Sequence, residues 1–133
     1  MYLRFMAPGW EVRRGVDRGL FGPAYSHLSD AATPDGIARA IGHEIEWFER
    51  ELPVPRRRAF CVRSKRCWRA DGICWFRDDA RAMIAHAHVL AALLTELGVW
   101  VTRHRTDRPG TILYRDDWQI IAKPDDATPT RWH

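Results

Sequence analysis

The amino-acid sequence predicts an α+β domain: a small mixed β-sheet with two principal helices on one face, ending in strand, helix and three-strand meander. Three observations predict this class. The chain has 133 residues, which suits a single hydrophobic core. Two segments repeat apolar residues at helical spacing, and several shorter segments alternate or run apolar as strands do. We expect one domain over residues 1–124 and a loose C-terminal tail over residues 125–133.

The first predicted strand is Tyr2–Met6, in which Leu3 and Phe5 share one face. Residues 7–33 hold four glycines and two prolines and show no regular apolar pattern. We therefore expect an irregular stretch there, packed on the domain through its apolar side chains.

The first predicted helix begins with Thr33 as its N-cap and Pro34 at its first position. It ends before Pro53, because proline cannot continue a helix. Its apolar residues make one stripe: Ile37, Ile41, Ile45, Phe48 and Leu52.

Trp47 lies on another face of this helix, about 200° from Ile45 around the axis. Two explanations stay open for it. Residues 7–33 cover this ring, which is the simpler explanation, or the ring is exposed for a partner.

A second helix and four strands are predicted beyond residue 72. The apolar run Ile73–Phe76 is typical of a strand buried on both faces. Asp78 or Asp79 is expected to cap the helix that follows, and Gly98 to end it. With the next strand this makes a right-handed unit of two parallel strands and a crossover helix. The closing strands are Val99–Arg105, Thr111–Arg115 and Trp118–Lys123.

The chain resembles a family of small uncharacterised bacterial proteins. The residues that carry the resemblance are Gly72–Phe76, Gly98-Val99, Arg105–Gly110 and Tyr114–Pro124, with Trp47-Phe48 and Leu52–Pro55 earlier in the chain. The resemblance spans Trp47 to Pro124 and implies a shared fold. It implies no activity, cofactor or site.

The predicted binding site is an arginine-rich segment in a basic loop region, residues 53–72. The whole chain has a net charge of +4, and arginine pairs well with phosphates and carboxylates. We expect a small non-catalytic interaction domain that binds an acidic protein or a nucleic acid, with Trp47 assisting. Pairing with Glu46, Glu49 and Glu51 inside the protein is the competing explanation. The binding residues are Arg56, Arg57, Arg58, Arg63, Lys65, Arg66, Trp68 and Arg69.

Metal binding is not predicted. The three cysteines Cys61, Cys67 and Cys74 form no C-x-x-C pair, and His86 and His88 point about 200° apart on a helix. We expect no metal, no cofactor and free thiols in a reducing cytoplasm. No segment is apolar and long enough to suggest a membrane span.

The alternative function is a metal-independent hydrolase, most plausibly a ribonuclease, that uses His104 or His86 with arginine support. Strand alternation weakens it, because His104 and Thr102 share one face of their predicted strand while Arg103 and Arg105 share the other. Homodimerisation through a sheet edge or the Trp47 face is compatible with either function.

Overall fold

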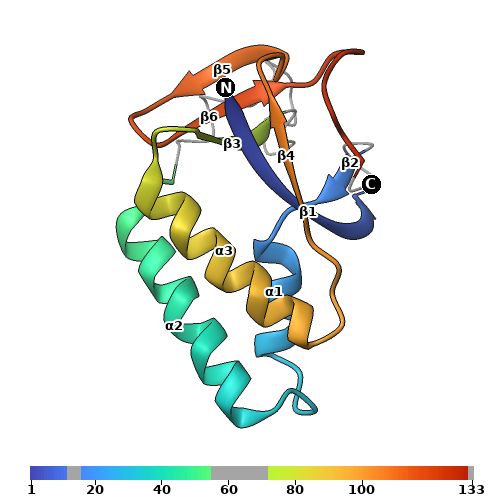
Figure 1. Ribbon diagram of the computed structural model, residues 1–133, viewed down its shortest axis with the longest axis vertical. Coiled ribbons are helices and arrows are strands. Elements are labelled where there is room, and N and C mark those ends of the chain that lie inside the picture. Colours follow the sequence, from blue (N-terminus) through green and yellow to red (C-terminus); the bar gives the residue numbers. More distant parts are fainter. Residues whose placement is uncertain (12–15, 55–71, 132–133) are drawn as a thin grey trace, which may run out of the picture.

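A computed structural model describes residues 1–11, 16–54 and 72–131. Helices lie together on one side of an antiparallel β-sheet (Figure 1), which confirms the α+β class and the predicted order of strand, helix and three strands. The described elements are β1 (Tyr2–Glu11), β2 (Val16–Arg18), α1 (Phe21–Leu28), α2 (Asp35–Glu51), β3 (Ile73–Arg77), α3 (Arg81–Glu96), β4 (Thr102–Thr106), β5 (Thr111–Arg115) and β6 (Gln119–Lys123).

The sheet has the order β4-β1-β3-β6-β5, and β2 pairs with the C-terminal half of β1. Every described pair is antiparallel, so the sheet is not mixed as predicted. The predicted parallel direction of the two strands that flank α3 is confirmed, because β3 and β4 are each antiparallel to β1. The first strand lies between these two strands: Tyr2 is opposite Arg77 of β3 on one side and Thr106 of β4 on the other. The local sequence pattern indicates the direction of β3 and β4 and the helix between them. It does not indicate that β1, from the start of the chain, pairs between them.

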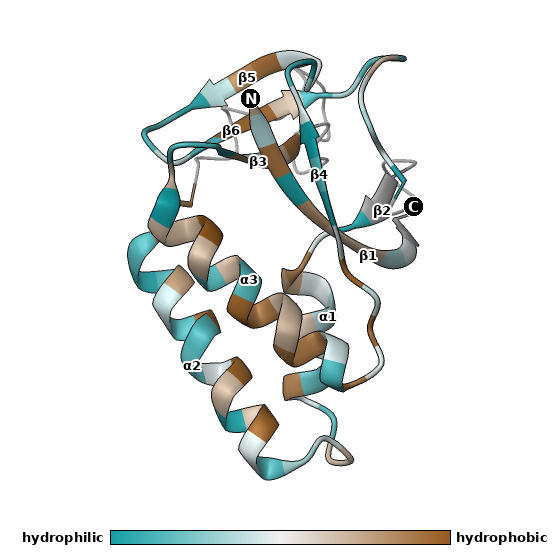
Figure 2. Ribbon diagram, viewed as in Figure 1, coloured by the Kyte–Doolittle hydropathy of each residue, from teal (hydrophilic) through white to brown (hydrophobic). Residues whose placement is uncertain are grey.

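The main core lies between the sheet and the helices. Both predicted helical stripes point into it, with Ile41, Ile45 and Phe48 of α2 against Leu90 and Leu94 of α3. Phe5 and Phe76 complete the core from the sheet. The hydropathy colours show the same arrangement, with brown turned toward the sheet and between the helices (Figure 2).

The opposite face of the sheet is buried as well. Met6, Ile73, Trp75, Ile120 and Ala122 form a second cluster, and each is 0% exposed. This burial confirms the prediction that Ile73–Phe76 is covered on both faces.

The predicted helix caps are wrong. Thr33 Oγ1 donates to the His27 carbonyl, and Pro34 precedes the first residue of α2 without a side-chain cap. Asp78 and Asp79 instead pair with the amino group of Met1 and with Arg77. A nearby cation offers these carboxylates a stronger partner than a backbone N–H group. Gly98 does end α3, with a φ of +86° that favours glycine.

Residues 7–33 are more regular than predicted. The first strand continues to Glu11, and α1 packs on α2 through Phe21 and Phe48, whose ring centroids lie 5.1 Å apart. Pro23 in the first turn of α1 is compatible with a helix, since the N–H group there has no partner within the helix. The expected loose tail contains a turn in which Thr128 is buried and bonds to Asp125.

Candidate interaction site

The arginine-rich segment lies outside the described residues, so Arg56, Arg57, Arg58, Arg63, Lys65, Arg66, Trp68 and Arg69 have no structural account. The described residues on either side of it do. Val54 precedes the segment and is 87% exposed, and Gly72 follows it and is buried. Val54 follows Pro53, and Gly72 lies two positions before Cys74. Both Pro53 and Cys74 bond to a residue of β6.

Gln119 of β6 joins the two sides. Its Nε2 donates to the Pro53 carbonyl at 2.7 Å, and its Oε1 accepts from the Cys74 thiol at 3.1 Å. The Gln119 side chain is 2% exposed, so these bonds form away from competing water. One buried amide therefore binds described residues on both sides of the arginine-rich segment.

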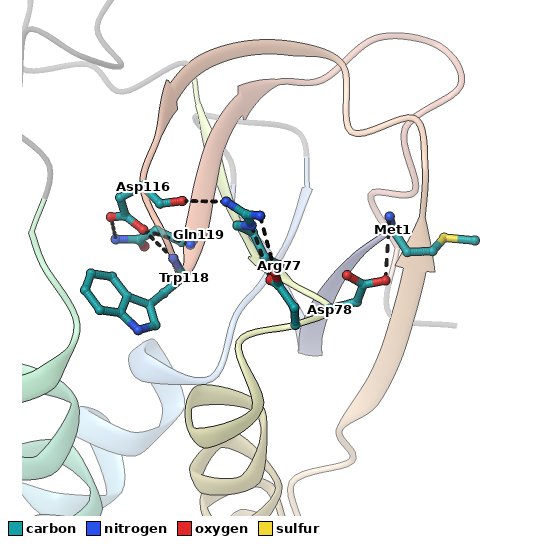
Figure 3. A network of polar contacts seen from close by, with 7 residues as sticks. Met1, Arg77, Asp78, Asp116, Trp118 and Gln119 are labelled. Carbon is teal, nitrogen blue, oxygen red and sulfur yellow. Dashed lines mark hydrogen bonds and ion pairs between the residues drawn. The ribbon is translucent and has the colours of Figure 1, made fainter.

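Asp116 supports this amide from the turn before β6 (Figure 3). Its Oδ2 accepts from Gln119 Nε2 at 3.1 Å, and its Oδ1 accepts from the backbone N–H groups of Trp118 and Gln119. Burial disfavours the carboxylate, but these bonds and one from Tyr114 outweigh it and lower the pKa of Asp116. Arg77 adds a bond to the Asp116 carbonyl at 3.3 Å. The turn is thus tied to β3 as well as to β6.

An apolar cleft of about 340 Å³ opens beside this clamp. Its walls come from α1, α2, β3 and β6, and its few polar groups include the Tyr25 hydroxyl, which donates to Glu49 at 2.7 Å. The cleft includes Pro53, Val54 and Cys74, so it adjoins both sides of the arginine-rich segment. The remaining apolar lining is Phe21, Ile45, Phe48, Leu52 and Ile121.

Charge is divided unevenly along the chain. The described residues contain 12 Lys and Arg against 16 Asp and Glu, a net charge of −4, whereas the whole chain has a net charge of +4. The positive balance therefore comes from the residues outside the described ranges. Residues 55–71 alone hold seven Lys and Arg against one Asp.

Two of the three glutamates expected to neutralise this segment have other partners. Glu49 accepts the bond from Tyr25, and Glu51 pairs with the neighbouring Arg50 at 3.3 Å. Glu46 lies farther back on α2, in a shallow hollow with Arg39 and His43. Tyr25 is neutral, so its bond leaves the charge of Glu49 in place, and the internal-pairing explanation stays open.

Trp47 is half-buried, and its ring contacts α3. Its ring stacks on the His86 imidazole, with centroids 3.6 Å apart and planes 12° apart. His86 Nδ1 lies 2.6 Å from Glu44 Oε2, and Glu44 is 8% exposed. The three side chains fasten α2 to α3, so the role that the structure gives Trp47 is a packing one.

The histidines of the hydrolase alternative lie on different elements. His86 faces α2, while His104 lies on β4 with its Nε2 3.0 Å from Thr102 Oγ1. The predicted alternation is confirmed, since Arg103 points to the other face and contacts His88 Nε2 at 3.2 Å. Neither His86 nor His104 lines any of the described hollows. The hollow that does combine His and Arg, at His43 and Arg39, is open to solvent.

The part of the chain that the structure describes contains no group of three His, Cys, Asp or Glu side chains placed to hold a metal ion. Likewise, none of its helices has the length and apolarity that a bilayer crossing requires.

Comparison with models of known protein families, with characterised proteins and with solved structures finds no significant match.

Proposed function

We propose that this protein is a non-catalytic interaction domain that binds an acidic protein segment through its arginine-rich segment, residues 56–69. One observation carries the proposal: the described body of the domain is net negative, and the positive charge of the chain is concentrated in residues 55–71. Seven cations so close together repel one another unless anions lie nearby. An acidic partner supplies those anions.

The apolar cleft favours a protein over a nucleic acid as the partner. Its walls are aliphatic and phenylalanine side chains, which suit apolar residues placed between acidic ones. The buried Gln119 clamp supports the same function, because it gives the segment a fixed base at Pro53 and Cys74. A fixed base lowers the conformational entropy lost on binding.

The test is binding of a labelled peptide of alternating Glu and Leu, with single-stranded RNA and duplex DNA as parallel probes. We expect the peptide affinity to fall at least about tenfold between about 50 and about 300 mM NaCl. Replacing Arg56, Arg57 and Arg58 with Ala should weaken binding by a similar factor. The matched control removes three exposed arginines elsewhere (Arg39, Arg108 and Arg115) and should change affinity less than about threefold.

Affinity that ignores salt, or that survives the loss of Arg56, Arg57 and Arg58, would sink the proposal. Tighter binding of RNA or DNA than of the peptide would replace the acidic protein with a nucleic acid as the partner. The hydrolase alternative predicts instead that the RNA probe is cleaved and that His104→Ala or His86→Ala stops the cleavage.

A further inference from the structure

The outward side of α3 carries an exposed apolar stripe, Ala82, Ala85, Val89 and Ala92, and Val89 is 47% exposed. His88 is exposed beside this stripe and contacts Arg103 of β4. A helix on a protein surface normally carries polar residues there. This face has the composition of a contact surface.

The charges at the ends of α3 are placed against its macrodipole. Arg81 is the first residue and Glu96 the last, whereas a helix is stabilised by anions at its start and cations at its end. Both side chains are exposed, and neither forms an ion pair within the described ranges. Both charges therefore interact unfavourably with the helix macrodipole. A neighbouring molecule with an anion near Arg81 and a cation near Glu96 would stabilise them.

We propose that α3 packs antiparallel against α3 of a second copy of this chain, about a two-fold axis near Val89. Val89 lies close to the midpoint between positions 81 and 96, so this register sets Arg81 opposite Glu96 of the partner subunit at both ends of the contact. The small residues Ala85 and Ala92 then face each other and permit close helix packing. The two macrodipoles oppose each other, which is favourable.

The contact is small, so the dimer is weak. A helix of 16 residues is about 24 Å long, and one helix pair buries less area than a standard stable interface. We expect a dissociation constant on the order of 50 μM, which lies in the range of transient complexes.

Sedimentation velocity from about 5 to about 500 μM brackets this constant and shows the monomer–dimer equilibrium directly. Val89→Glu places two like charges at the axis and should weaken the dimer more than about tenfold. The matched control is Val54→Glu, at an exposed valine outside α3, which should leave the constant within about twofold.

Charge exchange tests the antiparallel register. Arg81→Glu alone and Glu96→Arg alone each set like charges together at both ends and should each weaken the dimer at least about threefold. The double variant Arg81→Glu/Glu96→Arg restores opposite charges and should return to within about twofold of the original constant. A protein that stays monomeric up to about 500 μM would overturn the proposal. So would a dimer that tolerates Val89→Glu, or a double variant weaker than both single ones.

Discussion

Replacing Gln119 with Met removes the amide that joins both sides of the arginine-rich segment while keeping an unbranched side chain. The variant loses three side-chain hydrogen bonds: from Nε2 to the Pro53 carbonyl, from Nε2 to Asp116, and from the Cys74 thiol to Oε1. Each is worth about 0.5–1.5 kcal/mol net, and the Pro53 carbonyl left without its partner adds about 1 kcal/mol. The greater burial of an apolar side chain offsets about 1 kcal/mol.

We therefore expect Gln119→Met to lower the free energy of unfolding by about 1.5–4.5 kcal/mol, a loss of about 5–18 °C in Tm for a chain of this size. Urea unfolding followed by circular dichroism measures the first quantity and a thermal scan the second. Asp117→Asn, an exposed change in the same turn, is the control and should stay within about 0.5 kcal/mol of wild type. A Gln119→Met variant within that same margin would refute the view that the amide clamps the segment.

The same network has a pH dependence with a definite sign. The pKa of Asp116 is lower in the folded chain than its ordinary value, so the folded state holds this proton less tightly than the unfolded state. Its stabilising contribution is present above the unfolded pKa and is lost as pH falls through the folded pKa. The gap in stability between wild type and Asp116→Asn should therefore narrow from pH 6 to pH 3, as urea unfolding at each pH would show. A gap that widens as pH falls would contradict the network.

Two further predictions concern packing. A Cβ on Gly110, whose φ is +102°, would lie 1.9 Å from the Lys123 carbonyl oxygen, so Gly110→Ala should cost more than about 3 kcal/mol in urea unfolding. Gly36→Ala meets nothing within 4 Å and should instead gain about 0.5–1 kcal/mol; equal effects would contradict the geometry. Removing the His86 imidazole leaves the Glu44 carboxylate buried and unpaired. His86→Ala should lower the free energy of unfolding by about 2–3 kcal/mol. A double-mutant cycle with Glu44→Ala that shows no coupling energy would contradict the interaction between His86 and Glu44.

Periodicity could predict α2, α3 and most strands because each apolar stripe repeats within a short stretch of sequence, but it did not predict α1. The positions Ile41, Ile45 and Phe48 had to face one core wherever that core lay. The insertion of β1 between β3 and β4 could not be predicted in this way. Its pairing joins Tyr2 to Arg77 and Thr106, far along the chain, and one alternating segment fits either edge or centre of a sheet.

The candidate site was predictable only where it depended on composition. The charge of residues 56–69 is visible without a structure, but the bonds of Gln119 to Pro53 and Cys74 are not. Gln119 reaches Pro53 across 66 positions and Cys74 across 45, and a single Gln in a strand pattern gives no sign of such partners. Trp47 shows the same limit, because nothing in the pattern of α2 indicates that its ring stacks on His86 of α3.

The two proposed contact surfaces do not compete for the same residues. The cleft is lined by residues of α1, α2, β3 and β6. The proposed dimer face is the outward side of α3, and the inward side of α3 packs in the core. One copy can therefore hold a partner and a second copy at once. A two-fold dimer would carry two arginine-rich segments, and linked sites raise the effective concentration of the second contact. A weak dimer is then enough, because an acidic partner with repeated charge would stabilise the pair by binding both segments.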